Sequence, residues 1–132
     1  MQRPIPAATA DTREFWEACG RGELVYQVCR SCARAQFYPR RHCAYCQAGE
    51  PEWRRSAGLG AVYRHTTVYR APTPAFKADV PYVIALVDLD EGFRMMVNIL
   101  GCEPSAVVIG SRVRIVFRPT EGGVALPQGE LV

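Results

Sequence analysis

Hydrophobic and polar residues alternate along the second half of the chain with the period of two that is typical of β-strands. The segments AVYRHTTVYR (residues 61–70) and GSRVRIVFRP (110–119) follow this pattern, and in the second the arginines lie mostly on one face. The segment PYVIALVDLD (81–90) is apolar on both faces, as a central strand would be, and EGFRMMVNIL (91–100) follows it. Because the letters DEG between them suit a hairpin turn, we expect these two segments to pair.

The remaining segments of this half predict a barrel. CEPSAVVIG (102–110) fits a short turn of helix between the third and fourth strands. An OB-type barrel combines five strands with one helical connection at this place, and four or five strands within about 70 residues fit it. We therefore assign residues 58–132 to a small antiparallel OB-fold barrel.

The first half carries one helical pattern, DTREFWEACGRG (11–22). Asp11 can cap this helix, Glu14 lies three residues later as in a capping box, and Gly20 or Gly22 ends it. Its apolar stripe either packs on the rest of the fold or docks on another subunit, and both remain open. Its members are Phe15, Trp16 and Cys19.

Residues 1–10 are rich in proline and alanine and have no periodicity, so they form a mobile arm or lie across a partner. With the helix they make up the first part of the chain, residues 1–22.

A different pattern follows between residues 23 and 60. ELVYQV (23–28) predicts a strand that leads into a cysteine pair, and FYPRR (37–41) predicts an extended return segment whose Pro39 suits a sheet edge. Residues 47–60 contain glycine, proline and serine but no apolar run, so the boundary of this small unit falls there. We assign residues 23–53 to it.

The chain has six cysteines, and four of them form two CxxC pairs within this unit. The chain shows no basic segment followed by an apolar run, and no stretch approaches the ~18–20 apolar residues of a membrane span. We therefore expect a cytoplasmic protein with reduced thiols, in which clustered cysteines indicate a metal rather than disulfides. The expected ligands are Cys29, Cys32, Cys43 and Cys46.

The spacing CxxC-x10-CxxC fits a tetrahedral zinc site. Four thiolates fill the coordination shell and leave no position for an activated water, so the site should be structural. An iron site of rubredoxin type has the same ligands and stays open. His42 is expected at the surface, while Cys19 and Cys102 are expected to be small buried apolar residues.

Charge and catalytic motifs narrow the function further. The formal net charge is +3, and four thiolates with one Zn²⁺ reduce it to about +1, which weakens an argument for nucleic acid from charge alone. The two histidines, His42 and His65, have no nucleophile at a recognisable spacing. No P-loop or GxGxxG motif occurs, so the chain does not resemble an enzyme on its own.

Basic and aromatic residues indicate a binding function instead. They flank the zinc unit and the loop APTPAFKADVPY, and this mixture suits an anionic ligand with a flat base, either a nucleic acid or coenzyme A. The candidate ligand- or partner-facing residues are Arg40, Arg41, Arg70, Phe76, Lys77 and Tyr82.

The order of these motifs resembles a known family of rubredoxin-like zinc-ribbon and OB-fold proteins associated with acyl-CoA metabolism. The resemblance runs from FWEACGRGELVYQVCRSC to GGVALP, and its most specific stretches are CRSC…FYPRRHCAYC, GLGAVYRHTTVYR, PAFKADVPYVIALVDLDEG and VNILGCEPSAVVIGSRVRIVF. It implies a mainly β fold, with an N-terminal helix, a rubredoxin-like zinc ribbon and an OB-fold barrel.

The resemblance also implies a non-catalytic accessory subunit within a hetero-oligomer. Family members pair with thiolases or thiolase-like enzymes, such as benzoylsuccinyl-CoA thiolase, and with aldolases or hydratases. The catalytic residues then belong to the partner, and the small subunit helps to bind or channel acyl-CoA. The segment Pro74–Tyr82 is the expected ligand- or partner-facing loop.

A nucleic-acid-binding zinc-ribbon and OB module is the alternative. A nucleic-acid face on an OB barrel needs exposed aromatic residues on its second and third strands. Here these strands, YVIALVDL and FRMMVNIL, are mostly aliphatic, which favours the accessory subunit.

Overall fold

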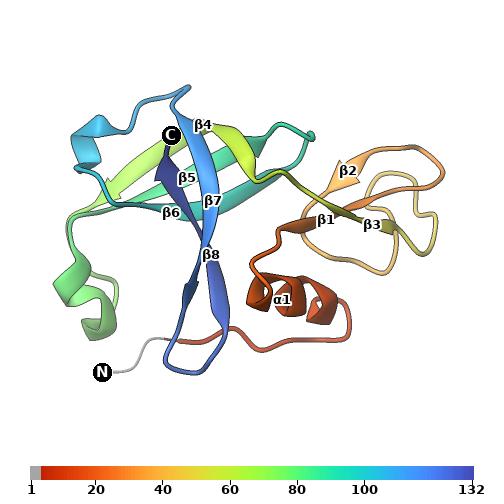
Figure 1. Ribbon diagram of the computed structural model, residues 1–132, viewed down its shortest axis with the longest axis horizontal. Helices are drawn as coiled ribbons and strands as arrows, with labels where there is room; N and C mark the ends of the chain where they lie inside the picture. Colours follow the sequence, from red (N-terminus) through yellow and green to blue (C-terminus); the bar gives the residue numbers. More distant parts are fainter. Residues whose placement is uncertain (1–3) are drawn as a thin grey trace.

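The computed structural model describes residues 4–132 and shows, in chain order, a helix, a three-stranded sheet and a five-stranded barrel (Figure 1). The mainly β fold class is therefore confirmed. The elements are α1 (Arg13–Gly20), β1 (Val25–Val28), β2 (Ala35–Gln36), β3 (Glu52–Arg55), β4 (Leu59–Val68), the 3₁₀ helix η1 (Pro74–Asp79), β5 (Tyr82–Leu89), β6 (Arg94–Leu100), the 3₁₀ helix η2 (Pro104–Ala106), β7 (Arg112–Pro119) and β8 (Ala125–Leu131). Within residues 4–132, no helix has the length and apolarity needed to cross a membrane.

Helix α1 forms as expected but is capped differently. Thr12 occupies the N-cap position without a capping side-chain bond, so the capping box predicted from Asp11 and Glu14 does not form. Instead, the N–H of Thr9 donates to Oγ1 of Thr12 at 2.9 Å, and the N–H of Thr12 donates to Oγ1 of Thr9 at 3.3 Å. These two bonds hold the turn before the helix, which leaves Asp11 exposed.

The apolar stripe of α1 packs on the chain's own fold. Phe15 and Cys19 are buried, and Trp16 is half-buried beside them. The ring of Phe15 meets that of Phe37 edge-on, with centroids 5.3 Å apart. The stripe is therefore part of the core and is not free to dock on another subunit.

The N-terminal arm also lies on its own chain. The side chain of Ile5 fills the space beside Gly122, in the turn between β7 and β8, where an added Cβ would come within 2.5 Å of Ile5 Cδ1. Ile5 thus lies against the chain's own barrel, whereas a mobile arm or a segment lying across a partner was expected. Residues 1–3 of the predicted arm lie outside the described residues.

The small sheet around the cysteines has the order β2-β1-β3, with β1 antiparallel to both neighbours. One expectation was wrong here: the return strand is Ala35–Gln36 and not residues 37–41, and Pro39 lies after it. The stretch 47–60, in which the boundary was placed, also contains a strand that was not foreseen. This strand, β3, pairs with the whole of β1 and leads directly to the barrel.

The barrel has the strand order β4-β5-β6-β8-β7 and is closed. All its pairs are antiparallel except β6–β8, a short parallel seam of two residue pairs, Ile99 with Gly129 and Leu100 with Glu130. The connection η2 lies between the third and fourth barrel strands, as predicted for an OB fold. Strand β8, which contains Pro127 and Gly129, had no recognisable period in the sequence.

Two glycines let the barrel strands approach each other closely. At Gly60 an added Cβ would lie 2.4 Å from the carbonyl oxygen of Asp88, on the paired strand β5. At Gly129 it would lie 2.8 Å from Ile99 Cδ1 and 2.9 Å from Val113 Cγ1. Gly129 therefore faces the core, and its neighbours along β8 face outward.

An aromatic stack joins the ribbon to the barrel. Phe93, at the end of the β5–β6 turn, is 4% exposed. Its ring is nearly parallel to those of Tyr26 on β1 and Phe37 after β2, with centroid distances of 4.5 Å and 5.6 Å. Because the three rings come from both units, they form one continuous core.

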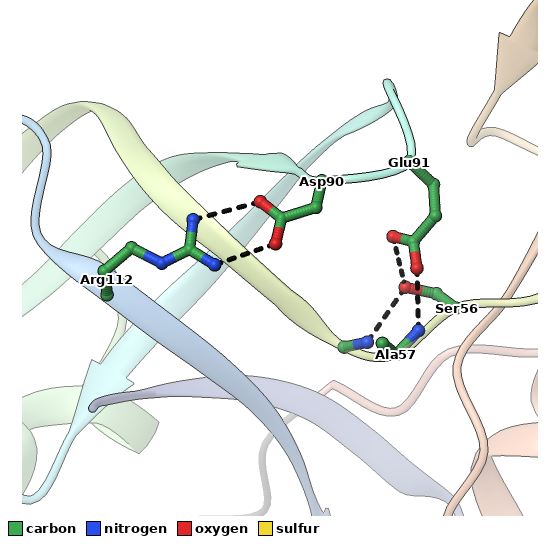
Figure 2. Close-up of polar contacts among 6 residues, drawn as sticks. Ser56, Ala57, Asp90, Glu91 and Arg112 are labelled. Carbon is green, nitrogen blue, oxygen red and sulfur yellow. Dashed lines mark hydrogen bonds and ion pairs between the residues drawn. The ribbon is translucent and has the colours of Figure 1, made fainter.

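The linker between β3 and β4 is held to the same turn (Figure 2). The hydroxyl of Ser56 and the N–H of Ala57 each donate to the Glu91 carboxylate at 2.7 Å, and Ser56 Oγ accepts from the N–H of Gly58 at 2.9 Å. Beside it, Arg112 forms a two-bond ion pair with Asp90 at 2.8 and 3.0 Å. The linker is thus fixed, and the ribbon keeps one orientation on the barrel.

Candidate functional site

The four predicted ligand cysteines come together in space. All four Sγ atoms lie within 4.8 Å of one another, with 3.5 Å between Cys29 and Cys46 and 3.7 Å between Cys32 and Cys43. A zinc–sulfur bond of about 2.3 Å gives a tetrahedron with edges of about 3.8 Å. The thiols therefore have the spacing that a tetrahedral zinc or iron ion requires.

Each CxxC pair folds as the same tight turn, so both turns point their sulfurs inward. The N–H of Ala33 donates to the carbonyl of Cys29, and the N–H of Gln47 donates to that of Cys43, each at 3.0 Å. Both turns end at a residue with positive φ, 63° at Ala33 and 67° at Gln47. The two CxxC turns thus share one backbone conformation, which prepares the site for a metal.

Backbone N–H groups make the first cysteine of each turn a better ligand. The N–H groups of Cys32 and Ser31 point at Cys29 Sγ at 3.3 Å and lower the pKa of this thiol to about 6. At Cys43, the N–H groups of Cys46 and Tyr45 lower the pKa in the same way. Since a metal binds the thiolate, these dipoles favour binding before the metal's own charge acts.

A buried pair of glutamine side chains fixes the distance between the two turns. Gln36 Nε2 donates to Gln27 Oε1 at 2.7 Å, and Gln27 Nε2 donates to the carbonyl of Arg40 at 2.9 Å. The N–H of Arg40 donates to Gln27 Oε1, and the N–H of Ala44 donates to Gln36 Oε1, both at 2.9 Å. These bonds join β1 and β2 to the segment that leads into the second cysteine pair, and no sequence pattern predicted them.

Replacing Gln27 with leucine should therefore loosen the metal. The change leaves the part-buried N–H of Arg40 without its acceptor, at a cost of about 1–3 kcal/mol, and leaves Gln36 Nε2 with only the longer bond to the carbonyl of His42 at 3.4 Å. We expect zinc to leave the variant at least about tenfold faster when a chromogenic chelator is added. The same substitution at Gln128, on the barrel, is the control and should leave the release rate unchanged; equal rates for all three proteins would contradict the role of the pair.

The other thiols and His42 stay outside the cluster. Burial raises the pKa of the Cys19 thiol to about 12, which makes it an apolar core residue as predicted. Cys102 is half-buried, packs against the core and also lines a cavity on the barrel. His42 is exposed and forms an isolated β-bridge with Gly49.

The six residues proposed to face a ligand or partner do not share one place: they are Arg40, Arg41, Arg70, Phe76, Lys77 and Tyr82. Phe76 and Tyr82 line a cavity on the barrel, with ring centroids 6.2 Å apart. Arg40 lines a groove between ribbon and barrel. The remaining three are exposed and line neither of these two hollows.

The groove and the adjoining strands carry exposed aromatic and basic groups. Tyr38 and Tyr45, on the ribbon side, are 63% and 56% exposed, and the barrel side includes Arg94. The guanidinium of Arg94 lies 3.7 Å from the ring centroid of Tyr63 and pairs with Asp88 at 2.5 Å. These contacts hold the Arg94 guanidinium and the Tyr63 ring in place on one face of the protein.

The face continues as an apolar strip on the outside of β5 and β6. Leu86 lies opposite Met96 in the register. Residues on either side of each are buried, so both side chains point outward. Met96 is 60% exposed. We call the set Tyr63, Leu86, Arg94 and Met96 the outer face.

Two family models match this chain. The one described as "ChsH2, rubredoxin-like zinc ribbon domain" matches residues 16–52, and the one described as "ChsH2, C-terminal OB-fold domain" matches residues 53–118. Together they cover the helix, the cysteine cluster and most of the barrel.

Similar proteins include subunits of larger enzymes. A "probable enoyl-CoA hydratase alpha subunit" of Thermomonospora curvata is 34% identical over 95% of this chain, which spans 39% of that protein. A "DUF35 domain-containing scaffold protein" of Methanocaldococcus jannaschii is 38% identical over 72% of this chain and 67% of its own length. A solved structure of an "Ltp2-ChsH2(DUF35) aldolase" contains a chain that is 31% identical, with a TM-score of 0.85 and coverage of 96% of this chain and 98% of that one.

Proposed function

Because this chain belongs to the ChsH2 (DUF35) family of zinc-ribbon and OB-fold proteins, we propose that it is a non-catalytic accessory subunit of an acyl-CoA-processing enzyme. Its partner would be an aldolase or a hydratase, as the names of the relatives indicate, or a thiolase-like enzyme, as the sequence resemblance implies. In this proposal the chain supplies a docking surface and part of the acyl-CoA path, and the partner supplies the catalytic residues.

The metal serves the docking role by fixing the ribbon. Cys29, Cys32, Cys43 and Cys46 would hold a structural zinc, because four sulfurs at tetrahedral spacing leave no site for water. A ribbon of about 30 residues cannot bury enough apolar surface to fold alone, so the metal replaces a core. Zinc supplies stability here and takes no part in a reaction.

The outer face is the observation that carries the proposal. Aromatic residues, arginine and methionine are enriched in protein interfaces, and Tyr63, Arg94 and Met96 lie together beside the groove. Ion pairing to Asp88 holds Arg94 in place, which reduces the entropy that docking would cost. A partner seated there would touch ribbon and barrel at once, and the fixed linker suits such a contact.

Nucleic acid fits this face less well. Single-stranded nucleic acid binds through exposed aromatic rings along the second and third OB strands. On β5 and β6 the outward residues near the centre are aliphatic, Ile84, Leu86 and Met96. Arg94 is also neutralised by Asp88, which reduces its attraction for phosphate.

Recovery of the tagged chain from its native cells, at moderate salt, should bring down an aldolase, hydratase or thiolase-fold subunit in stoichiometric amount. The partner is identified by mass spectrometry, and complex mass by size-exclusion chromatography. A subunit interface with an apolar core should persist when salt is added, whereas bound RNA should dissociate. RNA or ribosomal proteins as the recovered species would overturn the accessory role.

Met96→Glu should then reduce co-purification of the partner at least about tenfold, because it places a charge in the centre of the outer face. Val132→Glu is the matched control, since Val132 is 70% exposed and lies outside this face. Both variants should keep the wild-type zinc content and melting temperature. Equal partner recovery with both variants would place the interface elsewhere.

A further inference from the structure

The second half of β4 has a free edge. Strand β7 pairs with β4 only at residues 59–61, whereas β5 pairs with it as far as Val68. At Val62 the turn before β7 makes the last two backbone bonds on this side. The N–H of Val62 donates to the carbonyl of Ser111 at 2.9 Å, and the N–H of Gly110 donates to the carbonyl of Val62 at 2.8 Å. From there β4 extends past β7 toward η1, and within residues 4–132 its remaining partner strand is β5 (Figure 1).

The pairing of β5 shows which backbone groups of β4 point to this edge. The N–H of Leu89 donates to the carbonyl of Phe93 at 2.8 Å, so the backbone groups of Leu89 point toward β6. Along a strand, the N–H and C=O groups of successive residues alternate between its two sides. Leu86 and Ile84 lie at odd spacings from Leu89, so their backbone groups point toward β4.

His65 and Thr67 supply the open groups of the edge. Arg64 and Thr66 are the β4 partners of Leu86 and Ile84, so their own backbone groups point toward β5. By the same alternation, the N–H and C=O groups of His65 and Thr67 point away from β5. No other strand or turn within residues 4–132 bonds to β4 there, so two donors and two acceptors are left open.

The side chains along this edge suit an added strand. Residues 66–68 are two threonines and a valine, which are β-branched and favour an extended backbone. Lysine and proline often protect the edges of sheets, but residues 64–68 contain neither, and the register shift of β4 lies before them. In the turn before β7, Val108 and Ile109 are 56% and 62% exposed. An open edge beside exposed apolar residues is typical of a protein-binding surface.

Charge selects an acidic strand for this edge. The segment YRHTTVYR, residues 63–70, contains two arginines and no acidic residue. Both Arg64 and Arg70 are exposed and form no ion pair within residues 4–132. Arg64 is held in place, because its Nη1 donates to the carbonyl of Tyr63 at 2.7 Å and its guanidinium lies 4.4 Å from the centroid of the Tyr63 ring. Two copies of β4 would bring like charges together, whereas a carboxylate across from Arg64 would be attracted.

We propose that the partner enzyme adds an extended, acidic segment to β4 as a further strand, bonded to the backbone of His65 and Thr67 and paired with Arg64. This inference rests on the proposed function, because the partner supplies the segment. Strand addition joins the outer face directly, since Arg64 lies opposite Leu86 in the register. Backbone bonds then supply affinity, and alternate side chains of the segment supply specificity.

Amide hydrogen exchange tests the pairing in the full zinc-loaded chain, alone and in the recovered complex. In the free chain, the amides of His65 and Thr67 should exchange rapidly, whereas those of Arg64 and Thr66 should be protected by β5. In the complex, exchange at His65 and Thr67 should slow at least about tenfold. Mass spectrometry at single-residue resolution separates this alternate pattern from simple covering of a surface, which would leave no alternation.

Thr67→Pro should reduce recovery of the partner at least about tenfold, because it removes one open donor and places a ring where the added strand would lie. It removes no bond to β5, so zinc content and melting temperature should be kept. Ala8→Pro is the matched control, since Ala8 is exposed and its N–H makes no hydrogen bond within residues 4–132.

Arg64→Glu tests the charge without changing the backbone, and it should also reduce recovery about tenfold by repelling an acidic segment. Arg13→Glu is its control, because Arg13 is exposed on α1. If Thr67→Pro lowers the melting temperature, the charge pair decides, and equal recovery with Arg64→Glu and Arg13→Glu would overturn the proposal.

The remaining outcomes separate this proposal from the accessory role. A partner that co-purifies while His65 and Thr67 exchange as in the free chain would overturn strand addition and leave the accessory role standing. Protection of both amides in a dimer of the chain alone would also overturn it, since a second copy would then fill the edge. Recovery of RNA in place of an enzyme would overturn the two proposals together.

Discussion

Cys43→Ser should remove zinc from the chain and unfold the ribbon. A serine hydroxyl is a poor zinc ligand, and apparent zinc-binding free energies in small zinc units are about 10–16 kcal/mol, so the loss in stability should be on the order of 5 kcal/mol or more. Metal content should fall from one zinc per chain to none. Both tryptophans, Trp16 and Trp53, lie in the N-terminal half, so their fluorescence reports this unfolding directly.

The barrel should respond differently to the same variant. Its core includes Val62, Val87 and Val113, all buried in the barrel. Circular dichroism of its strands should therefore show a cooperative melt at a lower temperature. Cys102→Ser is the control, because this thiol lies outside the cluster and should keep one zinc per chain. A Cys43→Ser protein with full zinc content and an unchanged melting temperature would refute the assigned ligand set.

Phe93→Ala should lower the free energy of unfolding by about 3–5 kcal/mol, the usual cost of removing a buried phenylalanine. Phe93 is 4% exposed and stacks on Tyr26 and Phe37, so the cavity left behind lies between ribbon and barrel. Chemical denaturation followed by tryptophan fluorescence and by circular dichroism should then give separate midpoints, because the two units lose their shared core.

Phe93→Leu provides the graded comparison, since leucine refills much of the space and should cost only about 1–2 kcal/mol. Tyr63→Ala controls for loss of an aromatic ring at the surface, because Tyr63 is 37% exposed. A loss for Phe93→Ala no larger than that for Tyr63→Ala would show that the stack contributes little to stability.

Local chemistry explains why the metal cluster and the barrel could be predicted. The CxxC spacing sets the position of two sulfurs within one turn, whatever surrounds it. In the same way, the alternation along β7, with Val113 and Ile115 buried and Arg112 and Arg114 exposed, is imposed by one buried face and one outer face. Both signals depend only on residues that are close together in the sequence, so they can be recognised without knowledge of the tertiary fold.

The missed elements depend on partners far along the chain. Strand β3, with the letters EWRR, has no apolar alternation and forms because β1 offers it an edge. Glu91 looked like an ordinary turn acid, yet it accepts bonds from Ser56 and Ala57, about 35 residues earlier. The buried bonds of Gln27 and Gln36 were likewise invisible, because glutamine is usually exposed.

The candidate site likewise combines residues that the sequence marked with residues that only the fold brings together. The sequence marked Arg40, Phe76 and Tyr82 as one group of basic and aromatic residues, but the barrel separates them into a groove and a cavity. The open edge at His65 and Thr67 was not a candidate, since the pattern of a strand does not show which strands flank it. It becomes visible once the register shows where β7 leaves β4.

Closure of the β6–β8 seam depends on the absence of a side chain at position 129. Residue 129 has no Cβ, and this lets β8 settle against Ile99, Val97 and Val113. General substitution tables treat glycine to alanine as one of the mildest exchanges, but at this position one methyl group would hold two strands apart. Mutational surveys of such barrels should therefore find tolerance ordered by available space and not by chemical similarity, with position 129 among the least permissive.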